Sequence, residues 1–65
     1  ELMPEEFSLP GGLVARASGI RQDGRFLRFH LEVKRGDEVI HRDKHVVIDK
    51  PAHLTLEDIV ASKFA

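Results

Sequence analysis

The sequence predicts a small α+β domain in which a three-stranded antiparallel β-meander packs against one C-terminal helix. Apolar and polar residues alternate strictly along the middle of the chain, as they do in a half-buried strand. The dipeptide Asp23-Gly24 precedes that segment and is typical of a tight β-hairpin turn. Near the C-terminus the apolar residues recur at helical spacing instead, so we expect one helix to close the sheet.

The first twelve residues predict an irregular N-terminal arm, and residues 13–65 predict a single folded domain. Two prolines and a double glycine interrupt regular structure in the arm. Phe7 and Leu9 remain there as apolar anchors. We expect them either to lie along the domain or to reach a neighbouring subunit.

Three strands are expected at about residues 13–21, 25–34 and 38–48. If Asp23 and Gly24 form a two-residue loop, the apolar face of the central strand meets Ile20 and Val14 of the first strand. Arg16 is then the one discordant residue on that face. Leu13, Ala15 and Ala17 should point to the opposite face, because successive side chains of a strand alternate.

The register of the third strand depends on the turn around Gly36 and Asp37. A loop of two or four residues gives one register, whereas a loop of three residues would move every side chain of that strand to the other face. After Pro51, Thr55 offers an N-cap for a helix at about residues 55–64. Its apolar stripe should cover one face of the sheet; the stripe consists of Leu56, Ile59, Val60 and Phe64.

Length and composition restrict how such a domain can be stabilised. A chain of 65 residues buries only about 60% of the surface that its unfolded form exposes, so its core is small. The absence of cysteine excludes disulfides and thiolate zinc sites, which leaves histidine or carboxylate ligands, or self-association. It also fits an intracellular chain, and we expect a cytoplasmic location. No apolar run approaches the roughly 20 residues of a membrane span, so no membrane partner is expected.

The motif His41-x-Asp43-x-His45 suggests a divalent-metal site as a minor alternative. On a regular strand these three side chains share one face, and the preferred register places His30 opposite Asp43. Imidazole and carboxylate groups at that spacing can converge on a cation. Ordinary surface pairing between these groups is the favoured interpretation, so no cofactor is expected.

Nucleic-acid binding is the main alternative function. The predicted sheet region carries an excess of basic residues, although the net charge of the whole chain is −1. Basic side chains on a sheet can contact phosphates. The candidate residues are Arg16, Arg28, Arg42 and Lys44.

An enzymatic function is not expected, because no serine stands in a nucleophile motif and no glycine-rich phosphate loop precedes a helix. The stretch DGRFLRFHLEVKRGDEVI resembles the long terminal hairpin of hot-dog thioesterases. That resemblance covers less than a third of a chain that is too short for the whole fold, so a hot-dog fold is not predicted.

The first functional hypothesis is therefore a small non-enzymatic module that binds another protein, most simply a second copy of itself. The predicted sheet face away from the helix carries apolar side chains without an internal partner. The candidate contact residues are Leu13, Phe26 and Val47, with Phe7 and Leu9 of the arm.

Overall fold

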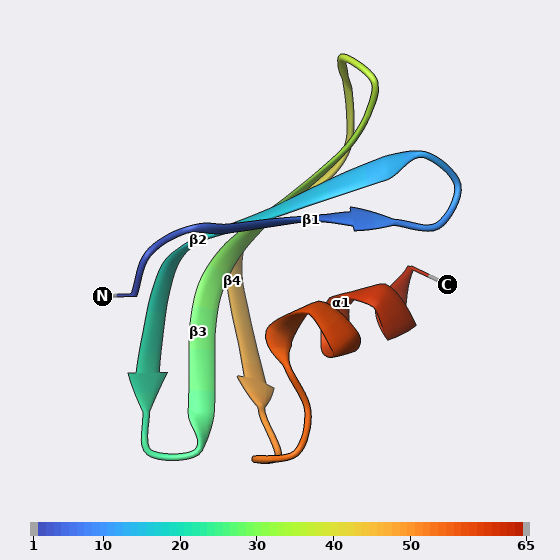
Figure 1. Cartoon of the computed structure of the whole chain (residues 1–65). Coiled ribbons are helices and arrows are strands. Elements are labelled where there is room, and N and C mark those ends of the chain that lie inside the picture. Colours follow the sequence, from blue (N-terminus) through green and yellow to red (C-terminus); the bar gives the residue numbers. More distant parts are fainter. Residues whose placement is uncertain (1, 65) are drawn as a thin grey trace.

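The computed structural model describes residues 2–64, which form four strands followed by one helix (Figure 1). The elements are β1 (Glu5–Leu9), β2 (Leu13–Asp23), β3 (Phe26–Arg35), β4 (Glu38–Asp49) and α1 (Leu56–Lys63). The strands form one antiparallel sheet in the order β1-β2-β3-β4. A meander with a C-terminal helix is therefore confirmed, but the sheet has four strands, not three.

The predicted irregular arm is wrong for residues 5–9, which form the edge strand β1. This strand pairs with β2 from Glu5 opposite Ala17 to Leu9 opposite Leu13. Its prolines lie outside the paired segment, where they break no ladder hydrogen bond. Phe7 and Leu9 are only 8% and 6% exposed, so burial of their side chains stabilises the strand.

The hairpin between β2 and β3 turns one residue later than expected. Asp23 pairs with Phe26, so the loop consists of Gly24 and Arg25. Farther along, Ala15 pairs with Val33, whereas the predicted register paired Val14 with Val33. The predicted facing of β2 is therefore reversed over its first half.

As a result, the small side chains of β2 belong to the core. Ala15 and Ala17 are fully buried, and Leu13 is 8% exposed. Arg16 is not discordant, because it lies on the solvent side opposite Glu32. The register follows from burial: the larger apolar side chains of β3 fill the space that the two alanines leave.

Strand β4 contains two irregularities that sequence periodicity did not reveal. One lies between Asp43 and Val46, and the other between Val39 and His41. His41 consequently pairs with Val33, on the side of the helix. Its ring packs edge-on against Phe64, with 5.2 Å between the ring centroids.

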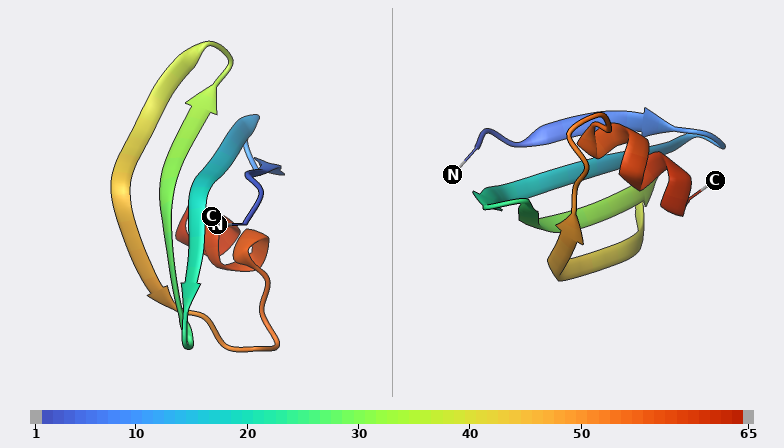
Figure 2. Two further views of the ribbon diagram at one scale, coloured as in Figure 1. Left: turned by 90° about the vertical axis from the view of Figure 1, so that its left-hand side faces the viewer. Right: turned by 90° about the horizontal axis from the view of Figure 1, so that it is seen from below.

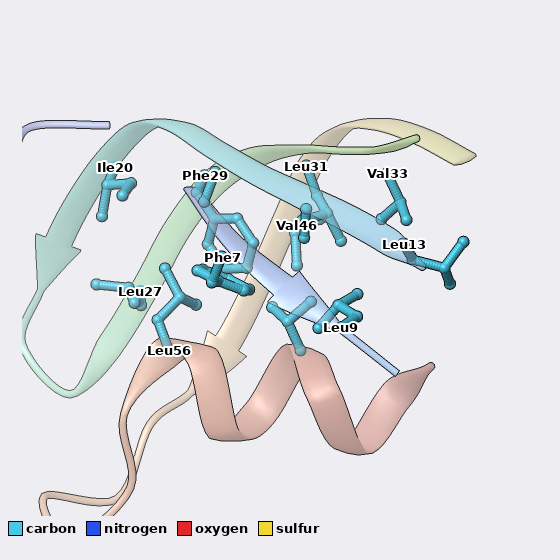
Figure 3. Packing of buried hydrophobic residues seen from close by; sticks show 13 residues of the cluster. Phe7, Leu9, Leu13, Ile20, Leu27, Phe29, Leu31, Val33, Val46 and Leu56 are labelled. Atoms are coloured by element: carbon cyan, nitrogen blue, oxygen red, sulfur yellow. The ribbon is translucent and has the colours of Figure 1, made fainter. Parts of the chain in front are cut away.

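The core lies between the sheet and α1, and β1 contributes to it (Figure 3). Thr55 caps the helix, and its side-chain oxygen accepts a hydrogen bond from the Asp58 backbone N–H at 3.1 Å. Leu56 and Val60 are the buried residues of the helix. The helix lies on the concave side of the bent sheet (Figure 2). The opposite side of β2, β3 and β4 is not covered by any described element, and we call it the outer face.

Candidate anion-binding face

The outer face presents the side chains that alternate with the core residues of β2, β3 and β4. Pairing across the strands places Arg16 beside Glu32, and Glu32 beside Arg42. Farther along, Arg21 pairs with Arg28, and Arg28 with Val47. Six of the side chains on this face are cationic: Arg16, Arg21, Arg28, Lys34, Arg42 and Lys44.

Four carboxylates lie along this face beside the six cations: Glu6, Asp23, Glu32 and Asp49. Glu32 accepts a hydrogen bond from Arg42 Nη2 at 2.9 Å and lies 3.8 Å from the Lys34 ammonium. Glu6 of β1 lies 3.8 Å from the Arg16 guanidinium. These pairs are substantially exposed and therefore contribute little to stability. Six of the ten lysine and arginine residues of the chain lie on this face, although the whole chain has a net charge of −1.

Two β-bulges lie at the same level of the sheet, one on each side of β3. On β2, Gly19 and Ile20 stand opposite Phe29 alone. On β4, Lys44 and His45 stand opposite His30 alone. A bulge redirects side chains and bends its strand, and bulges are frequent beside functional sites.

The first bulge depends on Gly19, which has a φ of +59°. A glycine in this conformation is the signature of the bulge type found here. The His30 ring lies against its backbone, because a Cβ at residue 19 would fall 2.6 Å from His30 Cδ2. No other amino acid could occupy this position without moving the ring.

The second bulge brings Lys44 and His45, which are consecutive in the sequence, to the same hollow. The His45 ring lies 6.0 Å from the His30 ring, measured between their centroids. Asp43 accepts a hydrogen bond from the His45 backbone N–H at 3.0 Å and thereby holds the bulged segment. The two bulges thus gather side chains from three strands around His30.

A hollow of about 360 Å³ lies between the bulges, and we call it the bulge hollow. Its floor includes Phe29 and Val46, and its cationic lining residues are Arg21, Arg28 and Lys44. His30 and His45 complete the polar lining. No carboxylate lines it within the described part of the chain.

Arg21 and Arg28 stand directly opposite each other in the β2–β3 ladder. Like charges at directly paired positions destabilise a sheet, because their side chains are held close together. The Arg28 guanidinium also lies 3.8 Å from the carboxylate of Asp23, and both side chains are mostly exposed.

A second hollow of about 310 Å³ adjoins the first, and His30 and Lys44 line both. Arg16 and Arg42 line this second hollow together with the acidic residues Glu32 and Asp43. It is therefore mixed in charge, whereas the bulge hollow is cationic.

The structure brings together the four residues predicted for nucleic-acid binding. Arg16, Arg42 and Lys44 line the second hollow, and Arg28 and Lys44 line the bulge hollow. Arg21 and Gly19 were missed as site residues. A glycine inside a strand pattern is a recognised signal for a bulge and could have identified Gly19.

The residues predicted for protein contact are divided between the core and the surface. Phe7, Leu9 and Leu13 are buried within the monomer, so they cannot reach a neighbouring subunit without unfolding β1. Phe26 and Val47 remain on the outer face, with exposed fractions of 44% and 57%. Arg25 lies over the Phe26 ring, 5.7 Å from its centroid.

The expected convergence of His41, Asp43 and His45 on one face is wrong. The bulge at Lys44 and His45 breaks the alternation, and His41 points toward α1. Among residues 2–64, no group of three or more histidine, aspartate or glutamate side chains is arranged to hold a metal ion. His30 and His45 remain neighbours, but as part of the bulge hollow.

Comparisons with protein-family models, with curated proteins and with solved structures find no match to this chain. In the described part of the chain, no helix is both long enough and apolar enough to cross a membrane. Functional inference therefore depends on the geometry of the outer face.

Proposed function

We propose that this domain binds single-stranded nucleic acid through its outer face. The observation that supports this most directly is the placement of six cationic side chains on one uncovered sheet face. Contacts between such side chains and phosphates supply most of the affinity of proteins for nucleic acids. The concentration of positive charge on one face of a chain with a net charge of −1 favours binding in one orientation.

Aromatic rings on the same face favour single strands. Phe26, His30 and His45 lie among the basic residues, and all three are exposed. Unpaired bases stack on phenylalanine and histidine rings, whereas the bases of a duplex are already stacked on each other. The one helix of the described chain lies on the opposite side of the sheet, so it is not placed to enter a duplex groove together with this face.

Self-association remains the competing hypothesis, and the exposed pair Phe26 and Val47 is the observation that favours it. The two side chains are diagonal neighbours on the outer face, because Phe26 pairs with Asp49 and Val47 with Arg28. Stacking this face on a second copy would also bring the two sets of cations together. That repulsion argues against a dimer built on this face alone.

The test is a fluorescence-anisotropy titration of a labelled single-stranded oligonucleotide of about 15 nucleotides, a length that spans the site sizes of small single-strand-binding domains. The same strand in a duplex, and a labelled polyglutamate of similar length, are titrated in parallel. We expect the tightest binding for the single strand. Equal binding of polyglutamate would show that the face attracts any acidic polymer and would overturn the proposal.

The decisive variant carries Arg16→Gln, Arg28→Gln and Arg42→Gln together. Each phosphate contact on a single strand adds about 0.7 to the slope of log affinity against log salt, so the slope should fall by about 2. The matched control is Arg35→Gln, Lys50→Gln and Lys63→Gln, which removes three positive charges from other parts of the surface. An equal loss of binding in both variants would refute a role for the outer face.

A further inference from the structure

We propose that the bulge hollow is a dedicated site for one phosphate monoester group. This inference rests on the proposed function and narrows it: the group would be the terminal phosphate of a strand or the phosphate of a mononucleotide. The first support is charge. Three cationic side chains and no carboxylate among the described residues line the hollow. A monoester carries a charge of about −1.5 to −2 at neutral pH, whereas each internal diester carries one negative charge.

The second support is that three neighbouring strands bring the cations to one hollow. Arg21 and Arg28 are directly paired across the ladder, and Lys44 reaches the same hollow from the other neighbouring strand. Lys44 has no carboxylate partner within residues 2–64. The bulge breaks the alternation of β4, so that the consecutive residues Lys44 and His45 both line the hollow.

The third support is the donor geometry. Arginine presents a planar fork of N–H donors that matches two phosphate oxygens, and lysine adds a compact charge. The exposed imidazoles of His30 and His45 add ring N–H donors beside them. The volume of about 360 Å³ lies at the small end of ligand sites, which suits a phosphate with part of its attached sugar.

The experiment is a ¹H–¹⁵N NMR titration of the whole chain with inorganic phosphate and with a nucleoside 5′-monophosphate. We expect saturable shifts of the Gly19, His30, Lys44 and His45 amides. In the variant Arg28→Gln with Lys44→Gln, affinity should fall about tenfold or more, because two charge-assisted contacts are lost. The control Arg16→Gln with Arg42→Gln alters only the second hollow and should retain phosphate binding. Well-dispersed spectra establish that each variant is folded.

A trinucleotide with and without a 5′-phosphate then separates the ligand sources. Tighter binding of the phosphorylated form, with shifts at the bulge hollow, supports a strand-end site. Equal affinity of the two forms would exclude the strand end as the source of the phosphate. Shifts that phosphate or the nucleoside monophosphate spreads over all exposed cations without saturation would overturn the monoester site. If oligonucleotides bind and phosphate does not, the pocket is refuted while the proposed function stands. If phosphate binds and oligonucleotides do not, nucleic-acid binding is refuted while the phosphate site stands.

Discussion

The His30 ring lies against the backbone of Gly19, so closely that a Cβ at residue 19 would be 2.6 Å from His30 Cδ2. This contact joins β2 to the middle of β3 at the level where both neighbouring strands bulge. It is also the edge of the bulge hollow. The contact therefore connects the stability of the bend to the proposed binding site.

Gly19→Ala is expected to destabilise the domain for two reasons. An alanine with positive φ costs about 1 kcal/mol, and the methyl group must also displace the His30 ring. Gly36→Ala is the control, since Gly36 has a φ of +60° but nothing within 4 Å of the added Cβ. Urea denaturation should show a larger loss for Gly19→Ala. Equal losses for both variants would mean that the His30 contact is absent in solution.

Phe7→Ala is expected to cost about 3–5 kcal/mol, the usual range for truncating a buried phenylalanine. Phe7 is 8% exposed and belongs to the core cluster, so a loss of that size could unfold so small a domain. Phe7→Leu should remain folded with a smaller loss. Met3→Ala, at a position 83% exposed, is the control and should be nearly neutral. If Phe7→Ala denatures at the urea concentration of the parent protein, β1 is an arm after all.

Acid should weaken the start of α1 through Asp58. The backbone N–H of Thr55, and secondarily its side chain, hold the pKa of the Asp58 carboxyl below its ordinary value of 3.8. Because the folded-state pKa is lowered, this interaction stabilises the domain above the unfolded-state pKa and is lost as pH falls through the folded-state pKa. Asp58→Ala should therefore lower the thermal midpoint at neutral pH, and its difference from the parent should shrink below about pH 4.

Glu57→Gln is the control for this pH series. Glu57 lies in the same first turn but makes no side-chain hydrogen bond or ion pair within the described residues. It should change the thermal midpoint less than Asp58→Ala at neutral pH. A difference between Asp58→Ala and the parent that stays constant across the acid range would contradict the assigned role of the carboxyl.

Glu32→Gln should strengthen oligonucleotide binding while leaving stability nearly unchanged. Glu32 lies on the outer face, where it accepts two hydrogen bonds from Arg42 at 2.9 and 3.1 Å. Its removal takes a negative charge from the proposed interface and releases Arg42 to contact phosphate. Exposed ion pairs contribute at most about 1 kcal/mol, so the unfolding midpoint should shift little. Weaker binding by this variant would count against the outer face as the phosphate-binding surface.

Local pattern was sufficient for the elements that repeat at one period. The alternation of Leu27, Phe29, Leu31 and Val33 predicted β3, and all four are buried. The Thr55 cap and the stripe after it predicted the helix. Local pattern did not predict β1. Five residues between two prolines show too short an alternation of apolar and polar residues, and the predicted register turned the partner strand β2 to the wrong face.

The candidate site shows the same division. The basic residues of the outer face could be identified from composition and strand assignment, and Arg16, Arg28, Arg42 and Lys44 do lie on one face. The distribution of these residues between two hollows could not be predicted from the sequence. The direct pairing of Arg21 with Arg28 could not be predicted either. The two hollows depend on bulges that shift the pairing of every later residue by one position, and the opposition of Arg21 and Arg28 depends on a turn that comes one residue later than predicted.

By itself, the sequence determined the order of the three long strands, the helix and its cap, and the basic character of the sheet, because these follow from local periodicity and composition. Only the tertiary structure decided which way β2 faces, where β4 bulges and that the N-terminal segment joins the sheet. The physical reason is that register is set by packing between residues distant in sequence. Ala15 and Ala17 are buried beside their partners Val33 and Leu31 in the ladder, and Phe7 belongs to the same core. Strand alternation has a period of two, so one extra residue at a bulge is enough to exchange core and surface.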